Sequence, residues 1–222
     1  MNFKQIKNLK GFMPDHEGVA LFKWAEKFSA LGPILEIGTY CGKSSMYLSL
    51  GAKKNDQYVF TIDHHLGSEE HQINEEYFDD ETYDHNNKRV NTLPLLIENI
   101  NQCKAKNIVP IVADSKEISS NWISNIGMLF IDGGHSYESA NNDYKYWESK
   151  IITGGCLVLL VNSLYISIRY FWTWRSCVCF QMRGFQGARV ETSTKVLKAW
   201  DNKSDFYWAP KIKPMTGTTT TT

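Results

Sequence analysis

The chain has 222 residues, 42% of them hydrophobic, which is enough apolar material for one sizeable core. Its 24 Lys and Arg residues balance 24 Asp and Glu residues, and this zero net charge argues against a general affinity for nucleic acid or for an anionic membrane. The five scattered cysteines lack zinc-finger spacing and, with no apolar signal segment at the amino terminus, lead us to expect a cytoplasmic protein.

The first predicted elements alternate between helix and strand. Residues 16–30 carry apolar side chains at helical spacing, and residues 33–38 form an apolar strand that ends at a glycine. A helix is expected at about 42–52, and residues 58–63 predict a second strand that ends in an acid. Such alternation predicts βαβ units and a parallel sheet.

A polar excursion at residues 64–88 interrupts this alternation. It contains four histidines among many acids, so a metal site is one interpretation and a solvated loop beside the substrate is the favoured one. The alternation resumes with a helix from about Pro94, strands at 108–113 and 128–131, and a helix at 137–150.

The last part of the chain is less regular. Residues 151–174 are apolar and aromatic, but two glycines, an asparagine and an arginine interrupt them, which favours a buried strand at 156–161 over a membrane span. A closing hairpin is expected at 185–199. We expect one domain over residues 1–210 and a disordered, threonine-rich tail at 211–222.

Acids stand at the ends of four predicted strands, and they are Glu36, Asp63, Asp114 and Asp132. In an open α/β sheet, ligands bind outside the carboxyl ends of the strands. A helix cap or a loop salt bridge explains any one of these acids equally well, but the four together favour a shared site. Because an unpaired charge on a buried strand is costly, Glu36 needs a cationic or hydrogen-bonding partner.

The spacing of the acids suggests their roles. Asp63 lies about 20 residues or slightly more beyond the glycine turn, where an acid can accept both ribose hydroxyls. Asp114 with Ser115 is placed to meet the exocyclic amine of a purine. Glu36 and Asp132 lie nearer the middle of the predicted sheet, beside the reacting group.

Five motifs occur in a fixed order between residues 30 and 161. They are Leu-Glu-Ile-Gly-Thr-Tyr-Cys-Gly-Lys-Ser-Ser, Thr-Ile-Asp-His-His, Ile-Val-Ala-Asp-Ser, Leu-Phe-Ile-Asp-Gly-Gly-His-Ser-Tyr-Glu and Ile-Ile-Thr-Gly-Gly-Cys-Leu-Val-Leu. This series resembles the class I S-adenosylmethionine-dependent methyltransferases of the small O-methyltransferase-like kind. An ordered series is far more specific than a lone glycine motif.

The resemblance implies a Rossmann-like α/β methyltransferase fold, with a mostly parallel seven-stranded sheet and helices on both faces. It implies S-adenosyl-L-methionine as the cofactor, with the glycines of the first motif close to its methionine part and the face of Tyr40 near its cation. The cofactor-binding residues it implies are Glu36, Gly38, Thr39, Tyr40, Gly42, Ser44, Asp63, His64, Asp114 and Ser115.

An NAD-binding protein is the alternative interpretation of the glycine turn. The turn reads Gly-x-x-x-Gly rather than Gly-x-Gly-x-x-Gly, which fits a dinucleotide less well. A flat purine and a sulfonium cation suit a crevice lined by acids and bordered by aromatic side chains.

Transfer of a methyl group to a hydroxyl requires alignment, together with a base or a cation that lowers the pKa of the acceptor. Asp132 and His135 are the expected catalytic residues, because they share one loop at the correct end of the sheet. His135 is either the base or a substrate-positioning group. An equally well supported role for His135 is to cap the helix that begins near Ser136.

No tight metal site is expected. Some relatives hold a divalent metal through the acid of the fourth motif and a second acid after the fifth strand, where this chain has Asn162 and Ser163. No Asp or Glu occurs between Glu148 and Glu191. Because a hard cation prefers several carboxylate oxygens, Asp132 with an amide is a poor site.

Residues 162–180 differ from the substrate loop of such relatives, because they are crowded with aromatic side chains and carry only Arg169 and Arg175 as charges. A local disturbance of the reading frame and a genuine aromatic lid both explain this. The leading hypothesis is methyl transfer to a small-molecule hydroxyl. The competing one is a cofactor-binding protein that has lost catalysis and acts through interaction, and an exposed aromatic stretch would suit a homo-oligomer.

Overall fold

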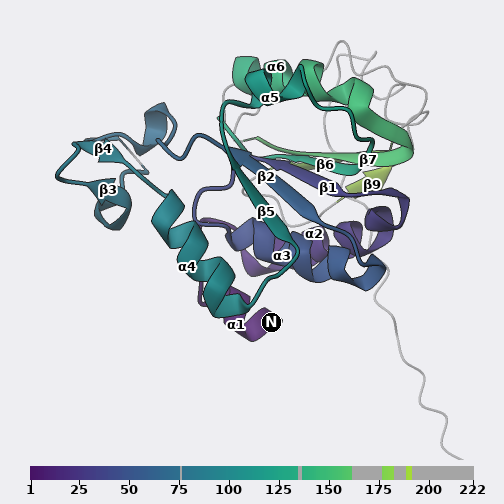
Figure 1. The fold of residues 1–222 in the computed structure, drawn as a ribbon, viewed down its shortest axis with the longest axis horizontal. Coiled ribbons are helices and arrows are strands. Elements are labelled where there is room, and N and C mark those ends of the chain that lie inside the picture. Colours follow the sequence, from purple (N-terminus) through teal and green to yellow (C-terminus); the bar gives the residue numbers. More distant parts are fainter. Residues whose placement is uncertain (76, 135–136, 162–176, 183–188, 192–222) are drawn as a thin grey trace, which may run out of the picture.

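A parallel sheet with helices on both faces forms the centre of the protein (Figure 1). The computed structural model describes residues 1–75, 77–134, 137–161, 177–182 and 189–191. The strands of the main sheet are β1 (Ile34–Ile37), β2 (Val59–Asp63), β5 (Ile108–Val112), β6 (Ile126–Ile131), β7 (Ile151–Val161), β8 (Cys177–Met182) and β9 (Arg189–Glu191). Their order is β5-β2-β1-β6-β7-β8-β9, and only β9 runs antiparallel to its neighbour.

The central strands β1 and β6 are buried along their whole length. Their side chains are almost all apolar, as expected for parallel strands that are covered on both faces. Ile37 lies opposite Ile62 of β2 and Ile131 of β6, so these three strands end at the same level. Their carboxyl ends therefore meet at one edge of the sheet.

Helices α1 (Phe3–Lys7), α2 (Asp15–Phe28), α3 (Lys43–Ala52) and α4 (Leu93–Cys103) contribute to the core on one face. Two glycines let α2 and α3 approach closely. A Cβ atom on Gly18 would lie 2.2 Å from the ring of Tyr47, and one on Gly51 would lie 2.5 Å from the carbonyl oxygen of Phe22. This close contact fixes the helix that begins directly after the glycine turn.

The opposite face is covered by α5 (Ser115–Ser119) and α6 (Tyr137–Trp147), as Figure 1 shows. Trp147 is fully buried there, and its ring meets that of Trp122 edge-on at 5.5 Å. Tyr144 packs with it against the apolar side chains of β1 and β6. Burial of two large aromatic side chains stabilises this layer by several kcal/mol, at roughly 25 cal/mol per Å².

Among the strands that the structure describes, β5 pairs only with β2 and forms one edge of the sheet. It contains Pro110, which lies opposite Thr61. Proline lacks the backbone N–H that a ladder needs, so an edge strand is where it is tolerated.

The α/β class and the predicted alternation around a parallel sheet of five strands, β5-β2-β1-β6-β7, are confirmed. The short helix α5 was not predicted, and the excursion at 64–88 contains an unpredicted hairpin of β3 (Tyr83–Asp84) and β4 (Arg89–Val90), flanked by 3₁₀ turns. The strand predicted at 156–161 begins earlier, because Ile151 already pairs with Ile126, and the glycine pair lies in an irregularity within β7 rather than before it.

The described residues contain no helix long and apolar enough to cross a membrane. Of the aromatic segment at 162–180, residues 162–176 lie outside the described residues, whereas residues 177–180 belong to β8. The tail at 211–222 and most of the hairpin predicted at 185–199 also lie outside the described residues. Strands β8 and β9 pair antiparallel. Their pairing begins at Val178, which precedes the start of the predicted hairpin. The single domain over residues 1–210 stays a prediction.

Candidate active site

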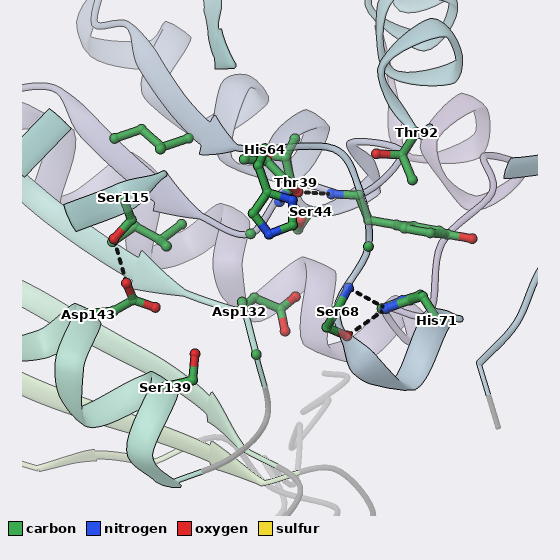
Figure 2. Close-up of a pocket in the computed structure, with 18 of the residues that line it drawn as sticks. Thr39, Ser44, His64, Ser68, His71, Thr92, Ser115, Asp132, Ser139 and Asp143 are labelled. Carbon is green, nitrogen blue, oxygen red and sulfur yellow. Dashed lines mark hydrogen bonds between the residues drawn. The ribbon is translucent and has the colours of Figure 1, made fainter. Parts of the chain in front are cut away.

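The carboxyl ends of β1, β2, β5 and β6 meet around a cavity of about 210 Å³ (Figure 2). Of the residues predicted for the site, the following line it: Gly38, Thr39, Tyr40, Ser44, Asp63, His64, Asp114, Ser115 and Asp132. Glu36 and Gly42 lie behind this lining, and His135 lies outside the described residues.

The glycine turn, residues 38–42, needs both of its glycines. Gly38 and Gly42 each have a φ of +84°, which L side chains rarely adopt. A Cβ atom on Gly38 would lie 2.4 Å from the carbonyl oxygen of Asp132, and one on Gly42 would lie 2.4 Å from Leu96. The turn therefore packs directly against the end of β6 on one side and against α4 on the other.

Asp63 holds the glycine turn in place. Its Oδ2 accepts hydrogen bonds from the backbone N–H groups of Thr39 at 2.8 Å and Tyr40 at 2.9 Å. Its Oδ1 accepts one from the N–H of His65 at 2.7 Å. A carboxylate has about four acceptor sites, so one remains for a ligand hydroxyl. The predicted ribose contact stays a prediction.

Glu36 is fully buried beneath the turn, and its two oxygens accept hydrogen bonds from the hydroxyls of Ser44, at 2.6 Å, and Ser45. The expected hydrogen-bonding partner is thereby confirmed. Burial raises the pKa of Glu36 to about 8, and the nearby carboxylates of Asp132 and Asp63 add to this while the two serines oppose it. Glu36 therefore supports the first turn of α3, and a direct contact of Ser44 with a cofactor stays a prediction.

The two residues predicted to frame a purine behave differently. Asp114 is exposed and caps α5, because its Oδ1 accepts a hydrogen bond from the N–H of Lys116 at 2.8 Å. Ser115 donates its hydroxyl hydrogen to Asp143 of α6 and accepts a hydrogen bond from the indole N–H of Trp147 at 3.3 Å. Burial raises the pKa of Asp143.

Sequence reasoning missed Asp143, although it lines the pocket. One signal was available, since Asp143 lies three residues after Ala140 and four before Trp147. Residues at these spacings share a helix face. The apolar stripe of α6 therefore already contained a half-buried acid.

Figure 2 shows the Ser115–Asp143 pair at one end of the pocket and the Ser68–His71 pair at the other, with Asp132 between them. The Nδ1 atom of His71 accepts hydrogen bonds from Ser68, and that of His64 accepts one from the N–H of Leu66 at 3.0 Å. These bonds place the ring hydrogen of each neutral histidine on Nε2.

An aromatic outer wall is formed by Phe12, Tyr40, His71 and Tyr77. The first three of these residues line the pocket, and Tyr77 packs against Phe12. Tyr40 stacks on His71 with ring centroids 5.4 Å apart and lies 5.2 Å from Phe12. Its hydroxyl donates to Asp79 at 2.7 Å. Burial and this hydrogen bond raise the pKa of Tyr40 far above its ordinary value, so the phenol stays protonated.

The outer wall is tied to the amino-terminal segment by Lys10, whose Nζ lies 2.7 Å from an oxygen of Asp79 and also contacts Glu81. Sequence reasoning missed Phe12 as a pocket residue, and it named His71 only as part of the excursion expected beside the substrate. The contacts join positions about 30 or more residues apart, so no local pattern could have revealed them. Among the described residues no cluster of His, Cys, Asp and Glu suits a metal, and the prediction of no tight metal site stays a prediction.

Three solved structures illustrate what the chain resembles. The cofactor-bound protein Rv0187 from MTB is 16% identical, with a TM-score of 0.50 over 71% of this chain and 60% of its own. The O-methyltransferase TomG from Streptomyces achromogenes is 16% identical, with a TM-score of 0.48 over 67% of this chain and 56% of its own. An O-methyltransferase from Bacillus cereus is 18% identical, with a TM-score of 0.46 over 68% and 62%.

The chain therefore spans about 60% of the length of these proteins, and the likeness to the first of them concerns the fold alone. The sequence profile of a family described as a methyltransferase domain matches residues 35–159, which is more than half of the chain. This range runs from β1 to β7 and includes the glycine turn and all the strand ends that border the pocket. The chain belongs to the methyltransferase domain family.

Proposed function

We propose that this protein transfers a methyl group from S-adenosylmethionine to a hydroxyl oxygen of a small molecule. The observation that carries the proposal is the glycine turn held by Asp63 at the rim of a pocket that three acids at neighbouring strand ends, Asp63, Asp114 and Asp132, line. Acids around the pocket favour a cationic ligand. In this proposal, β8 and β9 complete the seven-stranded sheet of the family fold.

The pocket suits both ends of such a cofactor. Helix α3 has Gly42 at its N-cap with no side-chain cap, so its first N–H groups can bind a carboxylate, and Lys43 lines the pocket nearby. At the other end, Ser115 and Asp143 offer polar groups to a purine edge. The face of Tyr40 is suited to a sulfonium cation.

When bound, the cofactor supplies a methyl group that its sulfonium already activates, so the chain itself must orient the acceptor and remove a proton. Tyr40 and Glu36 are poor bases for this purpose, since the first stays protonated and the second lies fully buried behind the turn. Asp132 lines the pocket near its middle. We propose Asp132 and His135 as the residues that orient the acceptor and accept its proton, without a tightly bound metal.

Calorimetric titration with S-adenosylmethionine and S-adenosylhomocysteine, followed by a product assay on a panel of small hydroxylated acceptors, tests this function. We expect binding of both and methylation of at least one hydroxyl. Repeating the assay with EDTA and with added magnesium tests whether the acceptor is activated without a metal. A strict dependence of turnover on magnesium would contradict the proposed role of Asp132 and His135.

A second function is a cofactor-binding protein without catalysis. Asn162, at a place where some relatives carry an acid, is the observation that favours it. Tight binding of both ligands with no turnover of any acceptor would support this second function. If neither ligand bound, both proposals would be wrong.

A further inference from the structure

The Ser115–Asp143 pair is anchored to the protein core. Ser115 bonds to Oδ1 of Asp143 and is itself held by the indole N–H of Trp147, a residue with no exposed surface. Trp147, at the end of α6, packs edge-on against Trp122 and contributes to the core on that face of the sheet. The position of the Asp143 carboxylate is therefore set by packing rather than by solvent.

The second oxygen of Asp143 faces the pocket floor. An ideal Cβ atom on Gly133 would lie 3.6 Å from Asp143 Oδ2 and 3.9 Å from a methyl group of Ile37. The missing side chain at Gly133 thus leaves room between an apolar surface and a carboxylate oxygen. No hydrogen bond from the described residues reaches Oδ2. A flat ring in this space would present its edge to that oxygen.

Asp114 is less suited to recognise a purine edge. It is exposed, and its Oδ1 already accepts the backbone hydrogen bond that caps α5. Solvent satisfies an exposed carboxylate with or without a ligand, so such a group discriminates weakly. A half-buried carboxylate discriminates strongly, because a ligand without the matching donor leaves it unpaired.

We propose that Oδ2 of Asp143, and not the carboxylate of Asp114, accepts a hydrogen bond from the exocyclic amine of the cofactor's adenine, with Ser115 holding the other oxygen in place. This inference rests on the proposed function, since it names the group that recognises the purine of the same cofactor. It assigns purine selectivity to the contact between α5 and α6.

The test compares S-adenosylhomocysteine with S-inosylhomocysteine, in which an oxo group replaces the amine. Calorimetry on the wild-type protein should show a preference for the amine of about 100-fold or more. Asp143→Asn keeps the shape and can keep the bond from Ser115, but it places an NH₂ group where Oδ2 was. This variant should bind S-inosylhomocysteine at least as well as S-adenosylhomocysteine.

Asp114→Asn is the matched control, and it should leave the wild-type preference within about threefold because a cap asparagine still accepts the backbone N–H. Near-equal binding of the two ligands by the wild-type protein would overturn the inference without any variant. An unchanged preference in Asp143→Asn, or a reversed one in Asp114→Asn, would also overturn it while the proposed function stands. If the wild-type protein bound neither ligand, the proposed function would fail with it.

Discussion

The glycine turn and the aromatic outer wall border the same pocket but are held by different forces. Beneath the turn, Glu36 and Ser45 have no exposed surface, and their hydrogen bond lies in the protein interior. The outer wall is held by Lys10, whose side chain is 28% exposed, and by Glu81, which is 77% exposed. Breaking a buried hydrogen bond leaves a group that water cannot reach, whereas an exposed ion pair exchanges its partner for water.

This difference separates the residues that stabilise the domain from those that border the entrance to the pocket. The turn fixes the backbone that lines the pocket, so changes there should destabilise the whole domain. The outer wall borders the pocket and is held by ion pairs that can break and re-form at small cost. Substitutions in the turn should therefore cost more stability than substitutions at the wall.

Gly38→Ala should have the largest effect. The substitution forces a side chain into a positive φ and places its Cβ atom 2.4 Å from a backbone oxygen, so the free energy of unfolding should fall by about 3–5 kcal/mol. Urea denaturation followed by circular dichroism measures this fall. Gly133→Ala is the control, because its nearest contact would be 3.6 Å away, and it should cost about 1 kcal/mol or less. Equal midpoints for the two variants would contradict the prediction.

Glu36 should make stability depend on pH. Its pKa is raised from 4.5 to about 8 in the folded protein, so the folded state binds this proton more tightly than the unfolded state does. The contribution of this proton to the free energy of unfolding is complete below pH 4.5. It is lost as the pH rises towards 8, at up to about 1.4 kcal/mol per pH unit.

Unfolding free energies of the wild-type protein and of Glu36→Gln, measured by urea denaturation across this pH range, give the contribution as their difference. The glutamine is nearly isosteric and does not titrate, so the advantage of the wild-type protein should shrink steadily with rising pH. A constant difference would mean that the carboxyl group keeps one protonation state throughout.

Asp63→Asn should have an intermediate effect. One oxygen and one NH₂ group cannot accept all three backbone hydrogen bonds that Asp63 now accepts, so the free energy of unfolding should fall by about 1–3 kcal/mol. Affinity for S-adenosylhomocysteine, measured by calorimetry, should fall as well because the turn loosens. Asp114→Asn, an exposed cap, should cost about 0.5 kcal/mol or less. A larger loss in Asp114→Asn than in Asp63→Asn would reverse the assigned roles.

Lys10→Met should have the smallest effect. The ion pairs it removes are partly exposed and screened by water, so the loss of unfolding free energy should be about 1 kcal/mol or less. Urea denaturation at low and at high salt measures it. The difference from the wild-type protein should shrink as salt is added. A loss as large as that of Gly38→Ala would remove the contrast between turn and wall.

Local patterns predicted the turn but not the wall. Gly38, Gly42 and the apolar run before them lie within a dozen residues, so the strand, the turn and the helix follow from neighbouring side chains. Lys10 and Asp79 meet across 69 positions, and this pairing depends on how the excursion folds back towards the amino-terminal segment. A contact between residues so far apart in the chain leaves no pattern that a single sequence reveals.

The site was predicted to a similar extent. The acids at the strand ends were found because each follows an apolar strand, and parallel strands bring their ends together. Their individual roles stay predictions. Asp143 was missed, although its spacing from Ala140 and Trp147 places it on the apolar face of α6. The helix α5 was missed because five residues carry no periodicity.

The proline in β5 has a consequence for how these molecules meet one another. The N–H of Ala113 donates to Asp63 of β2, and successive N–H groups of a strand point to opposite sides. Three residues earlier, the nitrogen of Pro110 therefore faces away from the sheet, where an approaching strand from a second molecule would need a donor. Within the described part of the chain, this edge of the sheet thus presents an interrupted row of hydrogen-bonding groups, which disfavours edge-to-edge aggregation at high protein concentration.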